Sequence, residues 1–242
     1  MSMSSLTGLS VREKNHEHDR YSVYLCVLCA LICEFVMRLL DLFCCAGGAG
    51  MGYHLAGFDV TGVDINPQPR YPFSFIQADV MDLPLEFLKK FDAIHASPPC
   101  QAHTLAQRIQ GNEHPDLIPA TRELLEKSGL PWIIENVEGA PLRNPVTLCG
   151  AMFKGLRVYR HRIFESNIRL IAPEHPQHVA PLRKMGRPVQ EGEFMHVVGN
   201  FSGVETAKKA MGINWMVRDG LREAIPPAYT EYLGRQLLEA CK

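Results

Sequence analysis

A cysteine that follows two prolines is the first group in this chain whose setting could support nucleophilic chemistry. The segment Pro98-Pro99-Cys100-Gln101 comes directly after residues 91–97, an apolar stretch that predicts a short buried strand. The prolines fix the backbone at the end of that strand, and strand ends are where open α/β sheets bind ligands. A thiolate held there could attack an electrophilic carbon. Taken alone, such a segment is more often a plain turn with a buried thiol.

Two further groups could assist a reaction at that thiol. Glu135 and Asn136 lie at the end of residues 131–137, which predict another buried strand. A carboxyl group at the end of a neighbouring strand could act as a general acid. Arg160 and Arg162 lie in residues 159–164, a strand-like stretch, and could stabilise negative charge on a substrate. On its own, such a stretch is more often a solvated strand face.

A glycine-rich turn, residues 45–52, could hold a nucleoside-like cofactor. It follows an apolar strand expected over residues 38–44, and glycines let a backbone approach a ligand closely. Asp64 ends the next expected strand, where a carboxylate can accept both ribose hydroxyls. Asp79 ends the third expected strand, where a carboxylate can accept an adenine amino group. These three strand ends together predict an adenosine pocket. No lysine of a phosphate-binding loop follows the glycines, which argues against phosphate binding of that kind.

These groups need a sheet to bring them together, and the apolar segments predict one. Strands are expected over residues 38–44, 58–63, 75–79, 91–96 and 131–137, and helices over residues 117–128, 206–211 and 226–241, with another short helix beginning at Tyr53. Strands that alternate with helices predict a Rossmann-like α/β fold with a doubly wound, mostly parallel sheet. Residues 172–193 have no periodicity and predict a small irregular lobe.

Composition narrows the class of protein. The chain has 242 residues, of which 46% are hydrophobic and 21% charged, which suits one large domain or a domain with a small lobe. The formal net charge of −1 excludes a global basic field, so nucleic-acid binding would need local positive charge. The eight cysteines have no regular spacing, which excludes a secreted disulfide scaffold and indicates a cytoplasmic protein.

The first 36 residues differ from the rest of the chain. Residues 21–36 are densely apolar but include Glu34, and they fall short of the roughly 20 residues that a membrane span needs. Cys26, Cys29 and Cys33 lack a histidine or fourth cysteine at zinc-finger spacing. We therefore expect a dispensable extension and no membrane segment, and we expect no metal site anywhere in the chain.

In combination, the motifs resemble those of the cytosine-5 DNA methyltransferase family. The matching segments, in the family's order, are DLFCCAGGAGMGYHLAGF (41–58), GVDIN (62–66), QAD (77–79), SPPCQ (97–101), ENV (135–137), RHRIF (160–164) and IPPAYTEYLG (225–234). The resemblance extends from residue 38 to the C-terminus. It implies transfer of a methyl group from S-adenosyl-L-methionine to C5 of a cytosine flipped out of duplex DNA.

The resemblance also implies roles for individual residues. Cys100 would bond to C6 of cytosine, Glu135 would protonate N3 and need a raised pKa, and Arg162 would contact O2. Asn136 would hold the loop or the edge of the base, and Arg160 would position Glu135 or a phosphate. The implied cofactor contacts are Phe43, Cys44, Ala46, Gly47, Gly48, Gly50, Met51, Asp64, Ile65, Asp79, Val80 and Pro99. The implied substrate contacts are Gln101, Arg183, Lys184 and Arg187.

The chain departs from the family pattern in three places. Val158 stands where the family has glutamine, and Arg222-Glu223 stands where it has Gly-Asn. The target-recognition region, residues 166–210, is short, so we expect a target of about two to four base pairs. Its local positive charge would come from His175, His178, Arg183, Lys184 and Arg187. The expected organisation is an extension (1–36), a catalytic domain (37–165), this region, and a C-terminal segment (211–242) that returns to the catalytic domain.

Two alternatives stay open at this point. The same chemistry could act on cytosine in RNA or in single-stranded DNA. A non-catalytic subunit that binds S-adenosylmethionine and regulates a partner is the other alternative. We expect a monomer, either with a cognate restriction endonuclease or without one.

Overall fold

The computed structural model describes residues 36–100, 115–183, 187 and 189–242. The order of the strands in the main sheet is β3-β2-β1-β4-β5-β7-β6. These strands are β1 (Arg38–Leu42), β2 (Asp59–Asp64), β3 (Ser74–Gln77), β4 (Ala93–Ala96), β5 (Trp132–Asn136), β6 (Val146–Leu148) and β7 (Arg162–Ser166). The first five are parallel, and β7 runs antiparallel to both β5 and β6. The predicted α/β class with a mostly parallel sheet is confirmed.

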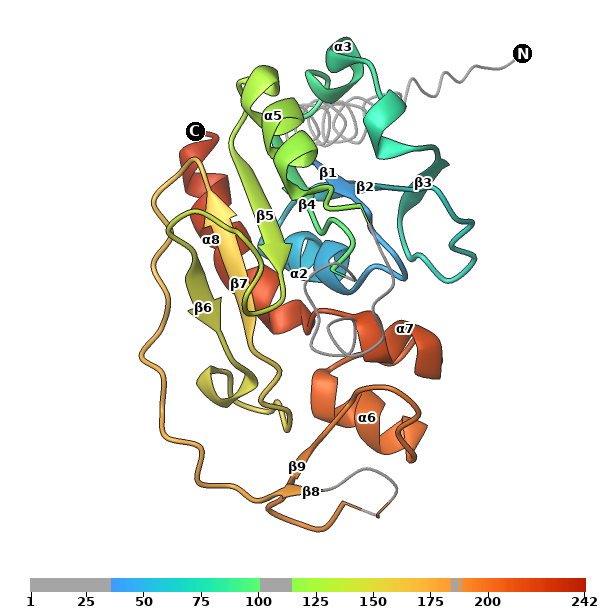
Figure 1. The fold of residues 1–242 in the computed structure, drawn as a ribbon, viewed down its shortest axis with the longest axis vertical. Helices are drawn as coiled ribbons and strands as arrows, with labels where there is room; N and C mark the ends of the chain where they lie inside the picture. Colours follow the sequence, from blue (N-terminus) through green and yellow to red (C-terminus); the bar gives the residue numbers. More distant parts are fainter. Residues whose placement is uncertain (1–35, 101–114, 184–186, 188) are drawn as a thin grey trace, which may run out of the picture. The chain divides into compact units, whose positions relative to one another are not determined.

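The apolar strands form because helices cover both faces of the sheet (Figure 1). Leu39 belongs to the core on one face, where α2 (Gly48–Ala56) and α8 (Pro227–Ala240) pack. Leu40 and Leu42 belong to the core on the opposite face, with residues of α3 (Leu85–Leu88) and α5 (Ile118–Ser128). Side chains alternate along a strand, so a run such as Arg38–Leu42 can serve both cores.

The order of the strands creates the site. The chain moves outward from β1 through β2 to β3 and then returns to place β4 on the other side of β1. The gap between the connections that leave β1 and β4 is a topological switch point, where doubly wound sheets bind ligands at the carboxyl ends of the strands.

Two boundaries near the cleft differ from the expected ones. The helix expected to begin at Tyr53 begins at Gly48, because Gly47 takes a left-handed conformation (φ 82°) and ends the turn early. The third strand ends at Gln77, and Asp79 instead caps a 3₁₀ helix, Val80–Asp82, by accepting a hydrogen bond from the Met81 amide.

The arginine-rich strand was predicted too early in the chain. β7 begins only at Arg162, because Arg160 has a positive φ of 26° that is incompatible with an extended strand. The short strand β6 and the helices α3 and α7 (Arg218–Glu223) were not predicted. The predicted helices over residues 117–128, 206–211 and 226–241 are observed as α5, α6 (Val204–Met211) and α8.

The region after β7 has its own small core. It contains a parallel pair of two-residue strands, β8 (Leu182–Arg183) and β9 (Phe194–Met195), followed by α6 and α7. Val197, Phe201 and Met211 are buried in a cluster that also includes Val158. Residues 37–242 form one compact unit, and the extension expected over residues 1–36 lies almost entirely outside the described residues. Within the described part of the chain, no helix combines the length and apolar character that a membrane crossing needs.

Helix α2 packs so closely on α8 that one glycine is required at the contact. A Cβ atom on Gly52 would overlap the carbonyl oxygen of Pro227 and the hydroxyl of Thr230. We therefore expect Gly52→Ala to lower the free energy of unfolding by about 1–3 kcal/mol, measured by chemical denaturation. Leu55→Ala, on the exposed side of the same helix, should change it by less than about 0.5 kcal/mol. If the two variants unfolded at the same denaturant concentration, this packing would be contradicted.

Candidate active site

A cleft of about 460 Å³ lies at the carboxyl ends of β1, β2, β4 and β5. Residues that follow four different strands line it, together with residues from the segment around α7. Among the residues that the structure describes, the lining includes five acidic side chains, Asp41, Asp64, Asp79, Glu135 and Glu223, and one basic side chain, Arg162. This charge balance suits a neutral or cationic ligand and disfavours a polyphosphate.

The loop that carries Cys100 is fixed by the neighbouring strand. β4 pairs with β5 through Ala96 and Ile134, and the Pro98-Pro99 segment leaves β4 at the rim of the cleft. The side-chain amide of Asn136 donates a hydrogen bond of 2.9 Å to the carbonyl of Pro98. Asn136 therefore holds the loop, which is one of the two roles expected for it, and it does not line the cleft.

Glu135 forms an ion pair with Arg162 inside the cleft. The distance from Arg162 Nε to Glu135 Oε1 is 2.9 Å, and the two side chains are 16% and 8% exposed. They meet because β7 is antiparallel to β5 and brings its first residue back to the end of β5. Burial raises the pKa of Glu135, although Arg162 and a hydrogen bond with Ser97 act in the opposite direction.

Cys100 is half-buried beside this pair. Burial and the Glu135 carboxylate raise the pKa of the Cys100 thiol, and Arg162 opposes that effect. The thiol is therefore protonated at neutral pH in the free protein. The thiol and the carboxyl group influence each other's charge, so their protons have to be considered together.

A chain of buried polar groups connects Glu135 to the core under α2. Ser97 bonds to Glu135, and the Ser97 hydroxyl lies 2.9 Å from His95 Nε2. His95 Nδ1 lies 3.0 Å from the hydroxyl of Tyr53. Burial lowers the pKa of His95 to about 3, so the ring is neutral and one nitrogen donates while the other accepts. This chain fixes the orientation of the Glu135 carboxyl group.

The two predicted cofactor carboxylates lie at the opposite end of the cleft. Asp64 accepts hydrogen bonds from the backbone amides of Cys45 (3.0 Å) and Asn66 (2.9 Å), which fix its orientation. Asp79 is exposed and lies on the next strand connection. The apolar side chain of Ile65 is 60% exposed here, and Phe43 lies in the same lining. An aromatic ring with polar edges would suit this surface.

Asp41 is a buried acid in the wall of the cleft. It is fully buried, and burial raises its pKa to about 7, although the hydroxyl of Tyr71 donates a hydrogen bond of 3.0 Å to Oδ2. Among the described residues, its Oδ1 has no hydrogen-bond partner. A buried acceptor without a partner is costly, so a ligand that donates a hydrogen bond or carries positive charge would stabilise it.

The C-terminal segment completes the cleft. The indole of Trp215 donates a hydrogen bond of 2.8 Å to the carbonyl of Ala46, in the glycine-rich turn. Arg160 Nη2 donates to the carbonyl of Arg222 (2.6 Å), and its Nη1 donates to the carbonyl of Val197 (2.8 Å). The guanidinium of Arg160 thus holds two backbone segments, and burial lowers its pKa to about 9. The guanidinium of Arg160 lies outside the lining of the cleft. It binds backbone carbonyls, whereas the resemblance implies that it positions Glu135 or a phosphate.

The structure brings most of the predicted site residues together. Those that line the cleft are Phe43, Cys44, Ala46, Gly48, Asp64, Ile65, Asp79, Val80, Pro99, Cys100, Glu135 and Arg162. Gly47, Gly50 and Met51 are not in the lining. A Cβ atom on Gly50 would lie 2.8 Å from Asp41 Oδ2, so this glycine is needed for close packing of the helix on the strand.

The predicted substrate residues are less well placed. Arg183 forms an ion pair of 2.7 Å with Glu193, which neutralises part of its charge. Arg187 is exposed. Gln101 and Lys184 lie outside the described residues. DNA contacts by these four residues therefore stay a prediction.

Several residues of the site were not predicted as site residues. Asp41, Ser97 and Glu223 line the cleft, and His95 supports it from below. The signal for Asp41 was an acid inside the apolar run of β1, and the signal for His95 was a histidine inside the apolar run of β4. Glu223 belongs to the pair that replaces Gly-Asn in the family pattern, so this departure places a carboxylate in the cleft.

Comparison of the sequence with known proteins gives one partial match. The chain is 30% identical over 116 residues to the type II methyltransferase M.FnuDI of Fusobacterium nucleatum. The match covers 43% of this chain and 33% of that protein, so the chain spans about a third of the length of this relative. No protein-family model matches the chain.

Comparison of the structures confirms the fold over most of the chain. A DNA modification methyltransferase encoded within a prophage of E. coli superposes with a TM-score of 0.60 at 15% identity. That match covers 84% of this chain and 99% of the other. The S. pombe Dnmt2 methyltransferase gives a TM-score of 0.54 at 15% identity, covering 84% of this chain and 98% of the other.

Proposed function

We propose that this protein transfers a methyl group from S-adenosyl-L-methionine to C5 of cytosine in DNA. The observation that carries the proposal is the convergence of Cys100, Glu135 and Arg162 in one cleft, next to acidic and apolar surfaces that suit an adenosine. The partial match to a type II methyltransferase supports the same reaction class.

The residues of the cleft suit this cofactor. Asp64 ends β2 and Asp79 lies in the connection just after β3, where these carboxylates could accept from the ribose hydroxyls and the adenine amino group. The unpartnered Oδ1 of Asp41 suits a cationic or donor group of the cofactor. The excess of acidic side chains in the lining favours a ligand that carries a sulfonium cation. When bound, S-adenosylmethionine supplies an electrophilic methyl group.

The residues around Cys100 would then activate the cytosine ring. The thiolate of Cys100 adds to C6, and the electron pair of the C5–C6 double bond shifts toward C5 and N3 as Glu135 gives its proton to N3. Arg162 stabilises the negative charge that develops near O2. After C5 has accepted the methyl group, the C5 proton leaves to solvent, Cys100 departs as thiolate, and N3 returns its proton to Glu135, which restores the neutral aromatic ring and the enzyme.

This mechanism requires one proton shared between Cys100 and Glu135. Since the pKa values of both groups are raised, we expect kcat/KM to follow a bell-shaped pH profile. Activity should fall at low pH, through a pKa above that of an ordinary glutamic acid, because both groups are then protonated. It should fall again in the alkaline range, when neither group retains its proton.

The profile can be checked by measuring kcat/KM across the pH range in which the enzyme stays folded. Glu135→Gln should remove the alkaline fall from whatever activity it retains, because only Cys100 then titrates and its thiolate is the reactive form. Both falls should persist in Glu126→Gln, which changes an exposed carboxylate on α5. A wild-type kcat/KM that falls neither at low pH nor at high pH would contradict the shared proton.

The substrate is tested by following a tritiated methyl group from the cofactor. The full chain is incubated with unmethylated duplex DNA, with the same duplex carrying 5-methylcytosine at every cytosine, and with transfer RNA. We expect label in the first substrate alone, and acid hydrolysis should recover it as 5-methylcytosine. Label only in RNA would move the activity to the RNA alternative, and no label in any substrate would favour a non-catalytic subunit.

A further inference from the structure

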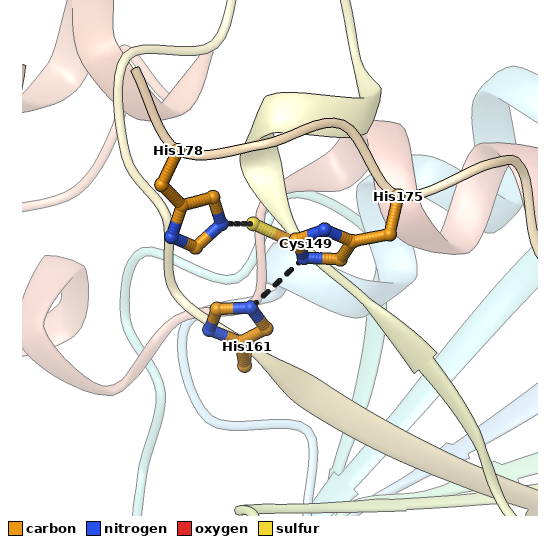
Figure 2. A group of neighbouring side chains, drawn as sticks. All are labelled: Cys149, His161, His175 and His178. Atoms are coloured by element: carbon orange, nitrogen blue, oxygen red, sulfur yellow. Dashed lines mark hydrogen bonds between the residues drawn. The ribbon is translucent and has the colours of Figure 1, made fainter. Parts of the chain in front are cut away.

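A second cluster of reactive side chains lies outside the cleft. Cys149, His161, His175 and His178 each offer one ligand atom, and these four atoms all lie within 4.8 Å of one another. Figure 2 shows the three imidazoles gathered around the sulfur. Cys149 directly follows β6, and His161 directly precedes β7. The two other histidines lie in residues 167–181, an irregular segment between β7 and β8 that we call the strap.

The sheet brings the first two ligands together. In the antiparallel pair of β6 and β7, Leu148 lies opposite Arg162, so Cys149 and His161 occupy the next positions at the same end. Cys149 is fully buried, and the side chain of His161 is 25% exposed. The buried thiol of Cys149 and the half-buried imidazole of His161 therefore lie side by side at one end of the β6–β7 pair.

The strap supplies the other two ligands. His175 and His178 are themselves exposed, yet both turn their rings toward the sulfur (Figure 2). The ring of His178 stacks on Tyr159 with centroids 3.7 Å apart, and the Tyr159 hydroxyl donates a hydrogen bond of 2.6 Å to the carbonyl of Ala180. The first part of the strap packs on the main core through Ile168, Leu170 and Ala172, so the histidine rings are attachments of its second part, residues 173–181.

The orientation of the nitrogens indicates a cation. Cys149 Sγ lies 3.2 Å from His178 Nε2, and His161 Nε2 lies 3.1 Å from His175 Nε2. Two Nε2 atoms that face each other can share only one hydrogen. Three imidazole nitrogens and one sulfur that all lie within 4.8 Å of one another are grouped as the ligands of one metal ion are grouped.

The donor set selects the metal. One thiolate and three imidazoles give four ligands of borderline softness, which is the preference of tetrahedral Zn²⁺. Zinc–ligand bonds of about 2.0–2.3 Å place the donor atoms roughly 3.3–3.7 Å apart, so the cluster needs a contraction of only about 1 Å. Glu138 Oε2 lies 3.9 Å from His161 Nδ1, where a carboxylate can orient a metal-bound imidazole.

We propose that Cys149, His161, His175 and His178 bind a structural zinc ion that fastens the strap to the β6–β7 pair. Four protein ligands fill a tetrahedral site and leave no position for a substrate, so the role is structural. One proposed ligand is the direct chain neighbour of an active-site residue. Arg162, which lines the cleft, follows His161 and donates a hydrogen bond of 2.8 Å to its carbonyl. The proposal does not depend on the proposed methyl transfer.

Metal content tests the proposal directly. The full chain, with any affinity tag removed, is incubated with one equivalent of zinc sulfate, desalted and measured by plasma mass spectrometry. We expect about one zinc per chain for the wild type and less than about a fifth of that for Cys149→Ser and His175→Ala. His196→Ala, which changes an exposed histidine outside the cluster, should retain the wild-type content. Equal zinc contents in all four proteins would overturn the proposal.

Cobalt substitution identifies the ligands without relying on zinc content. The wild type with Co²⁺ should show the visible bands of a tetrahedral site and a thiolate-to-cobalt charge-transfer band in the near ultraviolet. Cys149→Ser should lose the charge-transfer band, and an unchanged band would exclude the sulfur as a ligand. His175→Ala removes an exposed side chain, so its folding can be verified by circular dichroism before either measurement.

The fastening role has its own readout. Arg169 lies exposed in the strap, where trypsin can cleave after it. Removal of zinc with a chelator should increase the rate of cleavage at this bond at least several-fold in the wild type and leave the rate in His175→Ala unchanged. Cleavage that is equally fast with and without zinc in the wild type would contradict the fastening role.

Discussion

Cys100→Ser should abolish methyl transfer while the cofactor still binds. A serine hydroxyl keeps almost the size of the thiol, but it is a far weaker nucleophile toward C6. The adenosine end of the cleft is built from other residues, including Asp64 and Asp79, which the substitution does not touch. We expect activity below about a thousandth of the wild type, with the dissociation constant for S-adenosylmethionine within about threefold by calorimetry.

Cys241→Ser is a matched control for this substitution. Cys241 is half-buried at the end of α8, and it lies outside the cleft. Its replacement should leave turnover near the wild-type value. Residual activity in Cys100→Ser above about a thousandth of the wild type would show that Cys100 is not the nucleophile.

Glu135→Gln should lower turnover by about two to four orders of magnitude, because the amide cannot give a proton to N3. Glutamine has nearly the shape of glutamate, and its carbonyl oxygen can still accept a hydrogen bond from Arg162. We therefore expect the loss to appear in kcat, measured at saturating DNA and cofactor, with little change in the dissociation constant for the cofactor.

Glu165→Gln separates catalysis from stability. Glu165 is also a buried glutamate paired with an arginine, since Arg122 Nε lies 2.6 Å from its Oε1, but the pair lies outside the cleft. Its loss leaves Arg122 without its charge partner, so Tm should fall while turnover at a permissive temperature stays near wild type. If Glu135→Gln and Glu165→Gln lost activity to the same extent, the effect of the first would be structural and its catalytic role would be wrong.

The sheet could be predicted because its central strands β1, β4 and β5 are mostly apolar and buried. Leu39, Leu40 and Leu42 have to serve two cores, and such a run has few other uses in a globular protein. The strands at the edge of the sheet were harder to predict. β6 has only three residues, and the start of β7 depends on the positive φ of Arg160, which local sequence does not reveal.

The site was predictable where a motif follows a strand directly. Cys100, Glu135 and Asp64 were located because each follows an apolar segment, and a parallel sheet gathers such ends at one edge. The chain from Glu135 through Ser97 and His95 to Tyr53 depends on how α2 packs on the sheet. No spacing in the sequence encodes that contact.

The cysteine–histidine cluster illustrates the same limit. A search for zinc ligands in the sequence looks for pairs within one segment, and around Cys26, Cys29 and Cys33, which lie outside the described residues, it finds no complete finger spacing. Cys149 and His161 become neighbours only through the register of β6 and β7. His175 and His178 were interpreted as positive charge for a nucleic-acid contact, whereas in the structure both rings face the sulfur (Figure 2).

Covalent trapping tests the central claim most directly. A duplex that carries 5-fluorocytosine at its target position cannot lose the group at C5 as a proton, so a Cys100–C6 bond formed during methyl transfer should persist. With S-adenosylmethionine present, we predict a denaturation-resistant complex whose peptide map places the bond on Cys100. Cys100→Ser should give no complex. A wild-type protein that methylates ordinary DNA but forms no adduct, or an adduct on another residue, would contradict the account.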